Sequence, residues 1–288
     1  MLRITGPYVF ALIVTTLYSG TVSCLALTRP ASISAWSAAA CWECAAWHIA
    51  LSLGVWCYCR TVLTSPGFVD EPEVQAFLRQ HRSDRSLDGR RCEECEQAKP
   101  HRAYHSRVVD RCVLRFDHVC VFANNCVGAG NHKFFLLWQI YQFLASVFMV
   151  KISSEVIRAQ VLQTAAAGVE DVLLMLPAGL TLLGSLITAG FPGIYLPGHL
   201  SRAGRNISNV EQRKGISFDC GGRLQNLDRL LGRRRWLWWL PLQAPGLATV
   251  LSPETETETE RGRQRDRKRE GGRGTERGVG AEHAGKLQ

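Results

Sequence analysis

The sequence predicts an α-helical polytopic membrane protein with four transmembrane helices and a polar, cysteine-rich domain between the second and the third. The chain has 288 residues, 46% of them hydrophobic, and a net charge of +9, while its mean hydropathy is close to zero. That average hides two kinds of segment, because the apolar residues form long runs and the charged residues lie between them. Such segregation is typical of a multi-span membrane protein rather than of one soluble core.

Four apolar runs approach the roughly 20 residues that a helix needs to cross a bilayer. They cover residues 7–27, 33–59, 134–152 and about 172–196. The first run also fits a secretory signal peptide, but it is longer than a usual signal core and the second run follows after a few residues. This arrangement favours a helical hairpin. We expect the fourth run to be broken at Pro177 and Pro192.

The second run contains one acidic residue, Glu43. A carboxylate inside a membrane is a candidate functional residue, and a transporter or channel is one function that it would suit. A protonated or water-facing Glu43 near the end of the hairpin is the simpler interpretation.

Lysine and arginine are concentrated between Arg60 and Lys133 and again beyond Ser201, whereas the predicted short connections at 28–32 and 151–171 hold few. Since positively charged segments remain in the cytosol, we expect the middle loop, the C-terminal region and both termini on that side. The cytosol is reducing, so the loop cysteines are not expected to form disulfides.

The middle loop carries cysteine and histidine at the spacing of a metal site. Cys92 and Cys95 form a C-x-x-C knuckle, His105 follows ten residues later, and Cys112 comes next. Three thiolates and one imidazole make a closed tetrahedral zinc site, which stabilises a loop that has little hydrophobic core. The spacing therefore predicts a structural zinc ion at these four residues.

A second group, Asp117, His118 and Cys120, lies in the stretch RFDHVCVFANNCVG, with Cys126 six residues after Cys120. A cysteine near a histidine that is itself next to a carboxylate has the composition of an activated thiol. The same residues also suit metal coordination. Composition and spacing alone leave these two interpretations equally open.

The loop resembles the cysteine-rich domain of the DHHC protein S-acyltransferases, or palmitoyltransferases. The residues that match the family pattern without a gap are Cys92, Cys95, Lys99, Pro100, Arg102, His105, Cys112, Asp117, His118, Cys120, Asn125, Cys126, Val127, Gly128, Asn131 and Phe135. Further likeness lies outside the loop, at Ser65-Pro66-Gly67, Ser208-Asn209-Val210-Glu211, Phe218-Asp219-Cys220-Gly221 and Asn226. In total the resemblance covers about residues 5–243.

The resemblance implies a role for each residue of the second group. Cys120 would be the nucleophile that takes a fatty acyl group, expected to be palmitoyl, from acyl-CoA and passes it to a cysteine of a membrane-associated substrate protein. His118 would be its general base, and Asp117 would orient that base. The implied partners are therefore fatty acyl-CoA, substrate proteins and the lipid bilayer, with no nucleic acid, and the implied location is the Golgi or the endoplasmic reticulum.

The chain departs from the family pattern at the second zinc site of the family. The first site corresponds to the four residues that the spacing already indicates, whereas the second corresponds to Ser106, Val109, Val119 and Cys126. Because three of the four ligands of the second site are replaced, we expect one structural zinc ion. The Pro-Trp that follows the tetrad in the family is replaced by Val121-Phe122, so a rigid turn is lost.

Two functional hypotheses follow from the resemblance. The first is an S-acyltransferase whose catalytic strip is looser than in a member with two zinc ions, and the second is a weak or inactive relative that acts as a membrane scaffold or partner subunit. The intact Asp117, His118 and Cys120 favour the enzyme. The expected divisions are a transmembrane hairpin at 1–60, a cysteine-rich domain at 61–133, transmembrane helices 3 and 4 at 134–196, a cytosolic segment at 197–245 and a disordered tail at 246–288.

Overall fold

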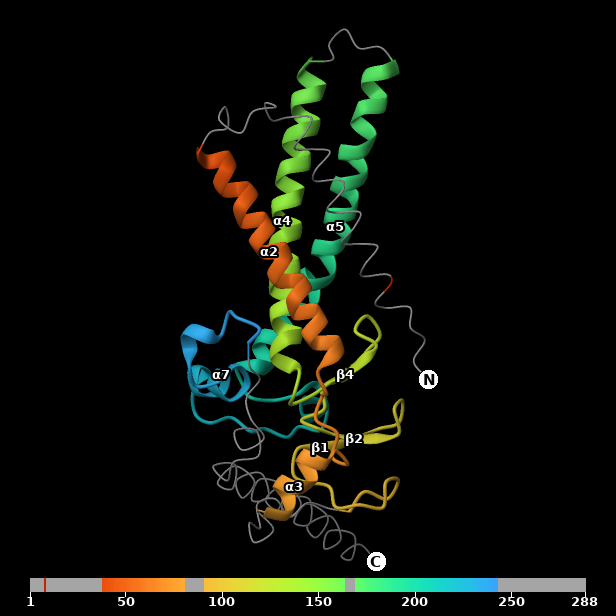
Figure 1. The fold of residues 1–288 in the computed structure, drawn as a ribbon, viewed down its shortest axis with the longest axis vertical. Coiled ribbons are helices and arrows are strands. Elements are labelled where there is room, and N and C mark those ends of the chain that lie inside the picture. Colours follow the sequence, from red (N-terminus) through yellow and green to blue (C-terminus); the bar gives the residue numbers. More distant parts are fainter. Residues whose placement is uncertain (1–7, 9–37, 81–90, 164–168, 243–288) are drawn as a thin grey trace, which may run out of the picture.

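The computed structural model describes residues 8, 38–80, 91–163 and 169–242. Except for Tyr8, the first apolar run lies outside the described residues, as does the predicted disordered tail. Three long helices stand above a small domain of hairpins and short helices (Figure 1). In chain order the elements are α2 (Ala38–Leu63), α3 (Pro72–Gln80), β1 (Ala103–Ser106), β2 (Arg111–Leu114), β3 (His118–Cys120), β4 (Asn125–Val127), α4 (His132–Gln163), α5 (Val169–Ala203), α6 (Asn209–Arg213), α7 (Arg223–Leu231) and the 3₁₀ turn η3 (Arg235–Leu237).

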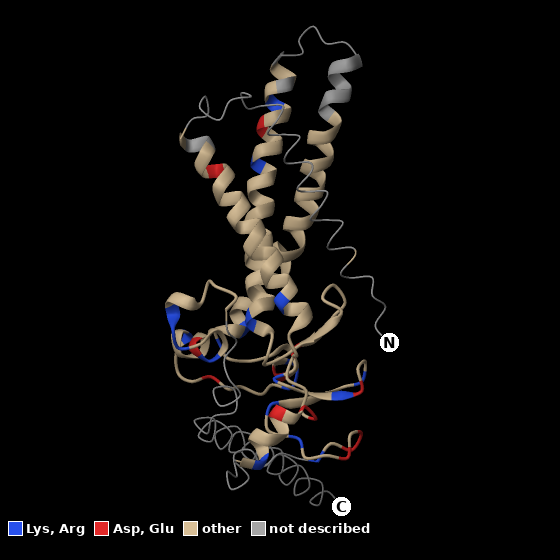
Figure 2. Cartoon of the chain, in the orientation of Figure 1, with Lys and Arg blue, Asp and Glu red and all other residues tan. Residues whose placement is uncertain are grey.

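Helix α4 is the centre of the helical part and packs against both α2 and α5. Figure 2 shows that charged residues are concentrated in the small domain, whereas the long helices carry few. Two segments in the described part of the chain, His132–Ala159 and Leu176–Ala203, are long and apolar enough to cross a membrane. The count of four spans stays a prediction.

Helix α5 is continuous from Val169 to Ala203 and contains Pro177, Pro192 and Pro197, so the predicted breaks at the first two prolines are wrong. Each proline removes one i→i−4 hydrogen bond, but an apolar helix that packs against a neighbour tolerates this loss. Helix α4 likewise continues past its predicted end to Gln163. Lys151, which was expected in a short connection, is therefore part of a helix.

Glu43 of α2 forms an ion pair with Lys151 of α4. The pair gives the carboxylate a cationic partner on the neighbouring helix, and both side chains are partly exposed. The water-facing position of Glu43 stays a prediction. A paired carboxylate joins two helices and gives no support to a transport pathway.

The cysteine-rich domain consists of two antiparallel hairpins, β1–β2 and β3–β4. The loop after α2 joins this domain through main-chain hydrogen bonds, among them Leu114 N–H to Gly67 O at 2.9 Å. The chain approaches so closely that a Cβ atom on Gly128 would lie 2.6 Å from the carbonyl oxygen of Pro66. Glycine at this position therefore lets the β4 end of the second hairpin lie directly against the end of α2.

Candidate active site and metal centre

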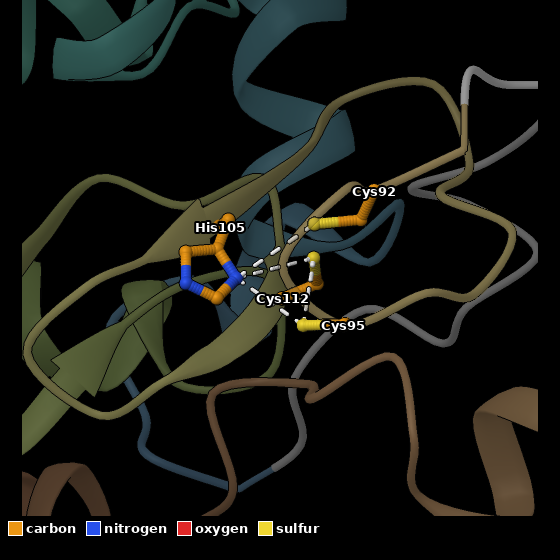
Figure 3. Close-up of side chains that lie close together, drawn as sticks. All are labelled: Cys92, Cys95, His105 and Cys112. Atoms are coloured by element: carbon orange, nitrogen blue, oxygen red, sulfur yellow. Dashed lines mark hydrogen bonds between the residues drawn. The ribbon is translucent and has the colours of Figure 1, made fainter.

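The first hairpin brings the four predicted metal ligands together. His105 on β1 lies opposite Cys112 on β2, and the knuckle of Cys92 and Cys95 faces them (Figure 3). His105 Nδ1 lies 3.8, 3.2 and 3.9 Å from the sulfurs of Cys92, Cys95 and Cys112, and the sulfurs of Cys95 and Cys112 are 3.7 Å apart.

These distances fit a tetrahedral zinc ion. With Zn–S about 2.3 Å and Zn–N about 2.0–2.1 Å, two sulfurs would be about 3.8 Å apart and a sulfur about 3.5 Å from the nitrogen. On the far side of the imidazole, His105 Nε2 lies 3.4 Å from Asp110 Oδ1. A carboxylate there fixes the tautomer that leaves Nδ1 free to bind a metal.

The positions of the family's second zinc site form no such cluster among the described residues. Ser106 and Cys126 are both buried, but Val109 and Val119 offer no ligand atom. Burial raises the pKa of the Cys126 thiol. The neighbouring Ser106 hydroxyl lowers that pKa, but by less than burial raises it, and Ser106 has no other hydrogen-bond partner among the described residues. Cys126 is thus a neutral, buried thiol.

The second hairpin separates Cys120 from Cys126. His118 and Cys120 are two residues apart on β3, and side chains at that spacing in a strand point to the same face. Val119 and Cys126 are directly opposite each other in the register, so they share the other face. Of the two thiols, only Cys120 therefore faces the imidazole of His118.

Asp117 anchors the group formed with His118 and Cys120. It is 1% exposed, its Oδ2 lies 2.8 Å from His118 Nδ1, and its Oδ1 accepts the backbone N–H of Asn209 at 2.7 Å. Both carboxylate oxygens thus have partners, and the bond to Nδ1 leaves His118 Nε2 free to exchange a proton.

This geometry shifts the pKa values of Asp117 and His118 in opposite directions. Burial opposes ionisation of Asp117, but the hydrogen bonds from His118 and Asn209 outweigh it, so the pKa of Asp117 is held well below its usual range. Burial likewise lowers the pKa of His118, but the hydrogen bonds to Asp117 and Cys120 and the charge of Asp117 outweigh it and raise that pKa to about 9. The carboxylate stays charged, and His118 binds a proton readily.

Cys120 is 5% exposed and belongs to an apolar cluster formed by the second hairpin, α2 and α4. Phe135 and Trp138 of α4 are in this cluster, and Tyr58 of α2 donates its hydroxyl to the carbonyl of Phe122 at 3.0 Å. The thiol therefore lies at the junction between the cysteine-rich domain and the helices, with apolar side chains around it.

Two asparagines hold this junction together. Asn125, which is opposite Cys120 in the register, and Asn131 both point their amides at the end of α2. The acceptors are the carbonyl oxygens of Thr61, Val62, Thr64 and, for Asn131, also Cys126. The last carbonyls of a helix have no partner within the helix, so these amides satisfy them and fix the hairpin that carries Cys120 to α2.

Sequence reasoning assigned no role to several buried residues around Asp117. Arg102 makes a bidentate pair with Glu211 at 2.8 and 2.9 Å, and His199 lies 3.9 Å from Asp117. Arg102 and Glu211 both belong to segments that match the family pattern. Their ion pair could not be predicted from the spacing, because they lie 109 positions apart in the sequence. Asn226, which lies in one of the matched patterns, donates to Gly204 O and accepts from Cys220 N–H, both at 2.8 Å.

Comparison with known proteins identifies the family. Residues 86–216 match the model of the DHHC palmitoyltransferase family. The chain is 30% identical over 217 residues to "Probable protein S-acyltransferase 12" of Arabidopsis thaliana, which covers 68% of this chain and 71% of the relative. It is 31% identical over 221 residues to "Probable protein S-acyltransferase 13" of the same plant, over 68% and 70% of the two chains.

A shorter match joins the chain to a human protein. It is 34% identical over 129 residues to "Palmitoyltransferase ZDHHC2" of Homo sapiens, over 36% of this chain and 35% of the relative. Together with the Cys/His cluster and the two apolar helices, these matches confirm the resemblance seen in the sequence. The chain belongs to the DHHC palmitoyltransferase family of polytopic membrane proteins with a cysteine-rich domain.

Proposed function

We propose that the protein is an S-acyltransferase that moves a fatty acyl group, expected to be palmitoyl, from acyl-CoA to cysteines of membrane-associated proteins through a thioester on Cys120. Its family and the names of its relatives support this class of reaction. One observation supports the roles proposed for these residues. Asn209 donates to Asp117, Asp117 is hydrogen-bonded to His118, and His118 lies on the same face of β3 as Cys120.

In the first half-reaction His118 takes the proton of the Cys120 thiol, and the thiolate attacks the carbonyl carbon of the acyl-CoA thioester. The bond between that carbon and the CoA sulfur breaks, the acyl group is joined to Cys120, and the CoA sulfur leaves with the proton held by His118. Asp117 favours the protonated imidazole throughout, because its charge lies 2.8 Å from Nδ1.

In the second half-reaction a substrate cysteine gives its proton to His118 and attacks the Cys120 thioester. The acyl group passes to the substrate sulfur, and Cys120 recovers the proton. Because one thioester is exchanged for another of nearly equal energy, a thiol nucleophile suits both steps. The apolar cluster around Cys120 supports a site in which the acyl chain lies among the helices.

The metal has a structural role in this proposal. Cys92, Cys95, His105 and Cys112 would hold one zinc ion, which stabilises the first hairpin and takes no part in acyl transfer. The charge distribution supports a cytosolic location for the cysteine-rich domain and both termini, in the Golgi or endoplasmic reticulum membrane. The scaffold alternative gains no support, because the catalytic group is complete and its partners are in place.

Acyl labelling tests the proposal. Full-length protein incubated with a labelled palmitoyl-CoA should form a thioester that hydroxylamine cleaves. Cys120→Ser should abolish the label, and His118→Ala should slow its formation by roughly 10²–10⁴-fold, the usual contribution of a general base.

The matched control is Cys126→Ser, which removes the other thiol of the same hairpin. Since Cys126 faces away from His118, this variant should keep most of the labelling. Folded, zinc-loaded wild-type protein that takes no label would contradict the enzyme assignment, and label that depends on Cys126 rather than Cys120 would contradict the choice of nucleophile.

A further inference from the structure

Asp117 has a second imidazole beside it. His199, in the last turns of α5, is 8% exposed, and its Nδ1 lies 3.9 Å from Asp117 Oδ2, the oxygen bound to His118. The rings of His118 and His199 are 5.9 Å apart, and each meets the ring of Phe135 edge-on at 5.0 Å. The position of His199 is thus defined by packing on the same aromatic side chain as the catalytic base.

Arg202 lies one turn further along α5 and donates from its guanidinium to His199 Nδ1 at 2.8 Å. A guanidinium can only donate hydrogen bonds, so Nδ1 must accept, and the ring is neutral with its proton on Nε2. The Nε atom of Arg202 is buried without a hydrogen bond to any described residue. His199 therefore stands between a cation and the carboxylate that the cation would otherwise attract.

We propose that His199 is a positioning residue that holds Arg202 away from Asp117 and thereby reserves the charge of Asp117 for His118. This role rests on the proposed function of His118 as the base for Cys120. Arginine pairs strongly and often bidentately with carboxylates, so an Arg202 that reached Asp117 would neutralise the charge that favours protonated His118. If the pKa of His118 fell from about 9 to its ordinary value of 6.5, the protonated fraction at pH 7.5 would fall about tenfold, and the population of the imidazolium–thiolate pair would fall with it.

The other charged and titratable groups at this place fit the same role. Asp117, His118 and Arg202 face His199. His132 of α4 and the buried Arg115 also interact electrostatically with Asp117. Together Asp117, His132 and His199 could also gather around a metal ion. Arg202 argues against a metal there, because it occupies His199 Nδ1 and brings a positive charge to the site.

The test compares variants of the full-length, zinc-loaded protein by the rate at which iodoacetamide alkylates Cys120, measured by mass spectrometry of its peptide as a function of pH. His199→Ala should slow alkylation about tenfold at pH 7.5, because Arg202 is then free to turn to Asp117. His199→Asn should retain a rate close to wild type, since its amide oxygen can accept from Arg202 in place of Nδ1. Adding Arg202→Met to His199→Ala should restore most of the rate, since the competing cation is gone.

A double variant as slow as His199→Ala alone would overturn the inference and leave His199 with a packing role only. A second zinc ion in the wild type that is lost in His199→Ala would also overturn it, in favour of a metal site. Alkylation reports the thiolate without acyl transfer, so the two proposals can fail separately. Wild-type protein that takes no acyl label yet shows the expected order of alkylation rates would contradict the proposed function and support the role of His199.

Discussion

At the scale of single residues, the proposed chemistry depends on which groups bind one buried carboxylate. Asp117 is bound by His118 on one oxygen and by the Asn209 N–H on the other, and the cation nearest to it on α5, Arg202, is occupied by His199. An imidazole in such surroundings gains a partner on folding, so its protonation is linked to stability.

This linkage predicts a loss of stability in alkali. The pKa of His118 is about 9 in the folded protein against 6.5 for an ordinary histidine. Stability from its protonated form is thus complete below about pH 6.5 and is lost as the pH rises through about 9, a change of at most about 3 kcal/mol. Thermal unfolding in detergent should show this loss between pH 6.5 and 9.5 in wild-type protein, and a flatter profile in Asp117→Asn. Parallel profiles for the two proteins would contradict the pairing.

At the scale of elements, the first hairpin (β1–β2) carries two of the predicted metal ligands and the second (β3–β4) carries His118 and Cys120. The sequence predicts the first hairpin, called the metal hairpin below, better than it predicts the ends of the helices. The metal ligands could be assigned because a C-x-x-C knuckle and paired strands bring their atoms together locally. Helix ends were less predictable. The hydrophobic pattern ends near Leu196, but α5 continues to Ala203, because tertiary contacts of its last turns with the cysteine-rich domain extend the helix beyond its apolar part.

The metal hairpin predicts one zinc ion per chain. His105→Ala should release it, since three thiolates would remain without the imidazole, and Asp110→Asn should weaken zinc binding roughly tenfold by removing the carboxylate that orients His105. Elemental analysis and chelator competition measure both effects. Glu96→Gln, which changes a nearby acidic residue of the knuckle, is the matched control for Asp110→Asn. A stoichiometry near two that persists in His199→Ala would show that Ser106 and Cys126 belong to a second site after all.

At the scale of the whole molecule, the cysteine-rich domain is bound at two places, the end of α2 and the segment that follows α5. Asn125 and Asn131 hold the end of α2, and Arg102 holds Glu211 in α6, beyond the end of α5. None of these long-range contacts could be predicted from local spacing, because tertiary folding brings together residues that lie far apart in the chain. The resemblance indicated that these positions matter but not what each of them binds.

The pair of Arg102 and Glu211 gives the last prediction. Both side chains are almost fully buried, Arg102 also stacks on Phe218 at 4.2 Å, and Glu211 closes the capping box of α6 with Ser208. Arg102→Met would leave a buried carboxylate without its cation, which costs about 3–5 kcal/mol. It should also displace the Asn209 N–H from Asp117, so thermal stability and acyl labelling should fall together.

Adding Glu211→Gln to Arg102→Met removes the unpaired charge but keeps an acceptor for the Ser208 N–H. The double variant should therefore be more stable than Arg102→Met alone, because a buried pair is costly to break but less costly to replace on both sides. Labelling should recover to the extent that α6 returns to its place. If Arg102→Met is as stable as wild type and labels at the same rate, Arg102 and Glu211 do not couple the cysteine-rich domain to the segment after α5, and the position of Asn209 on Asp117 must depend on other contacts.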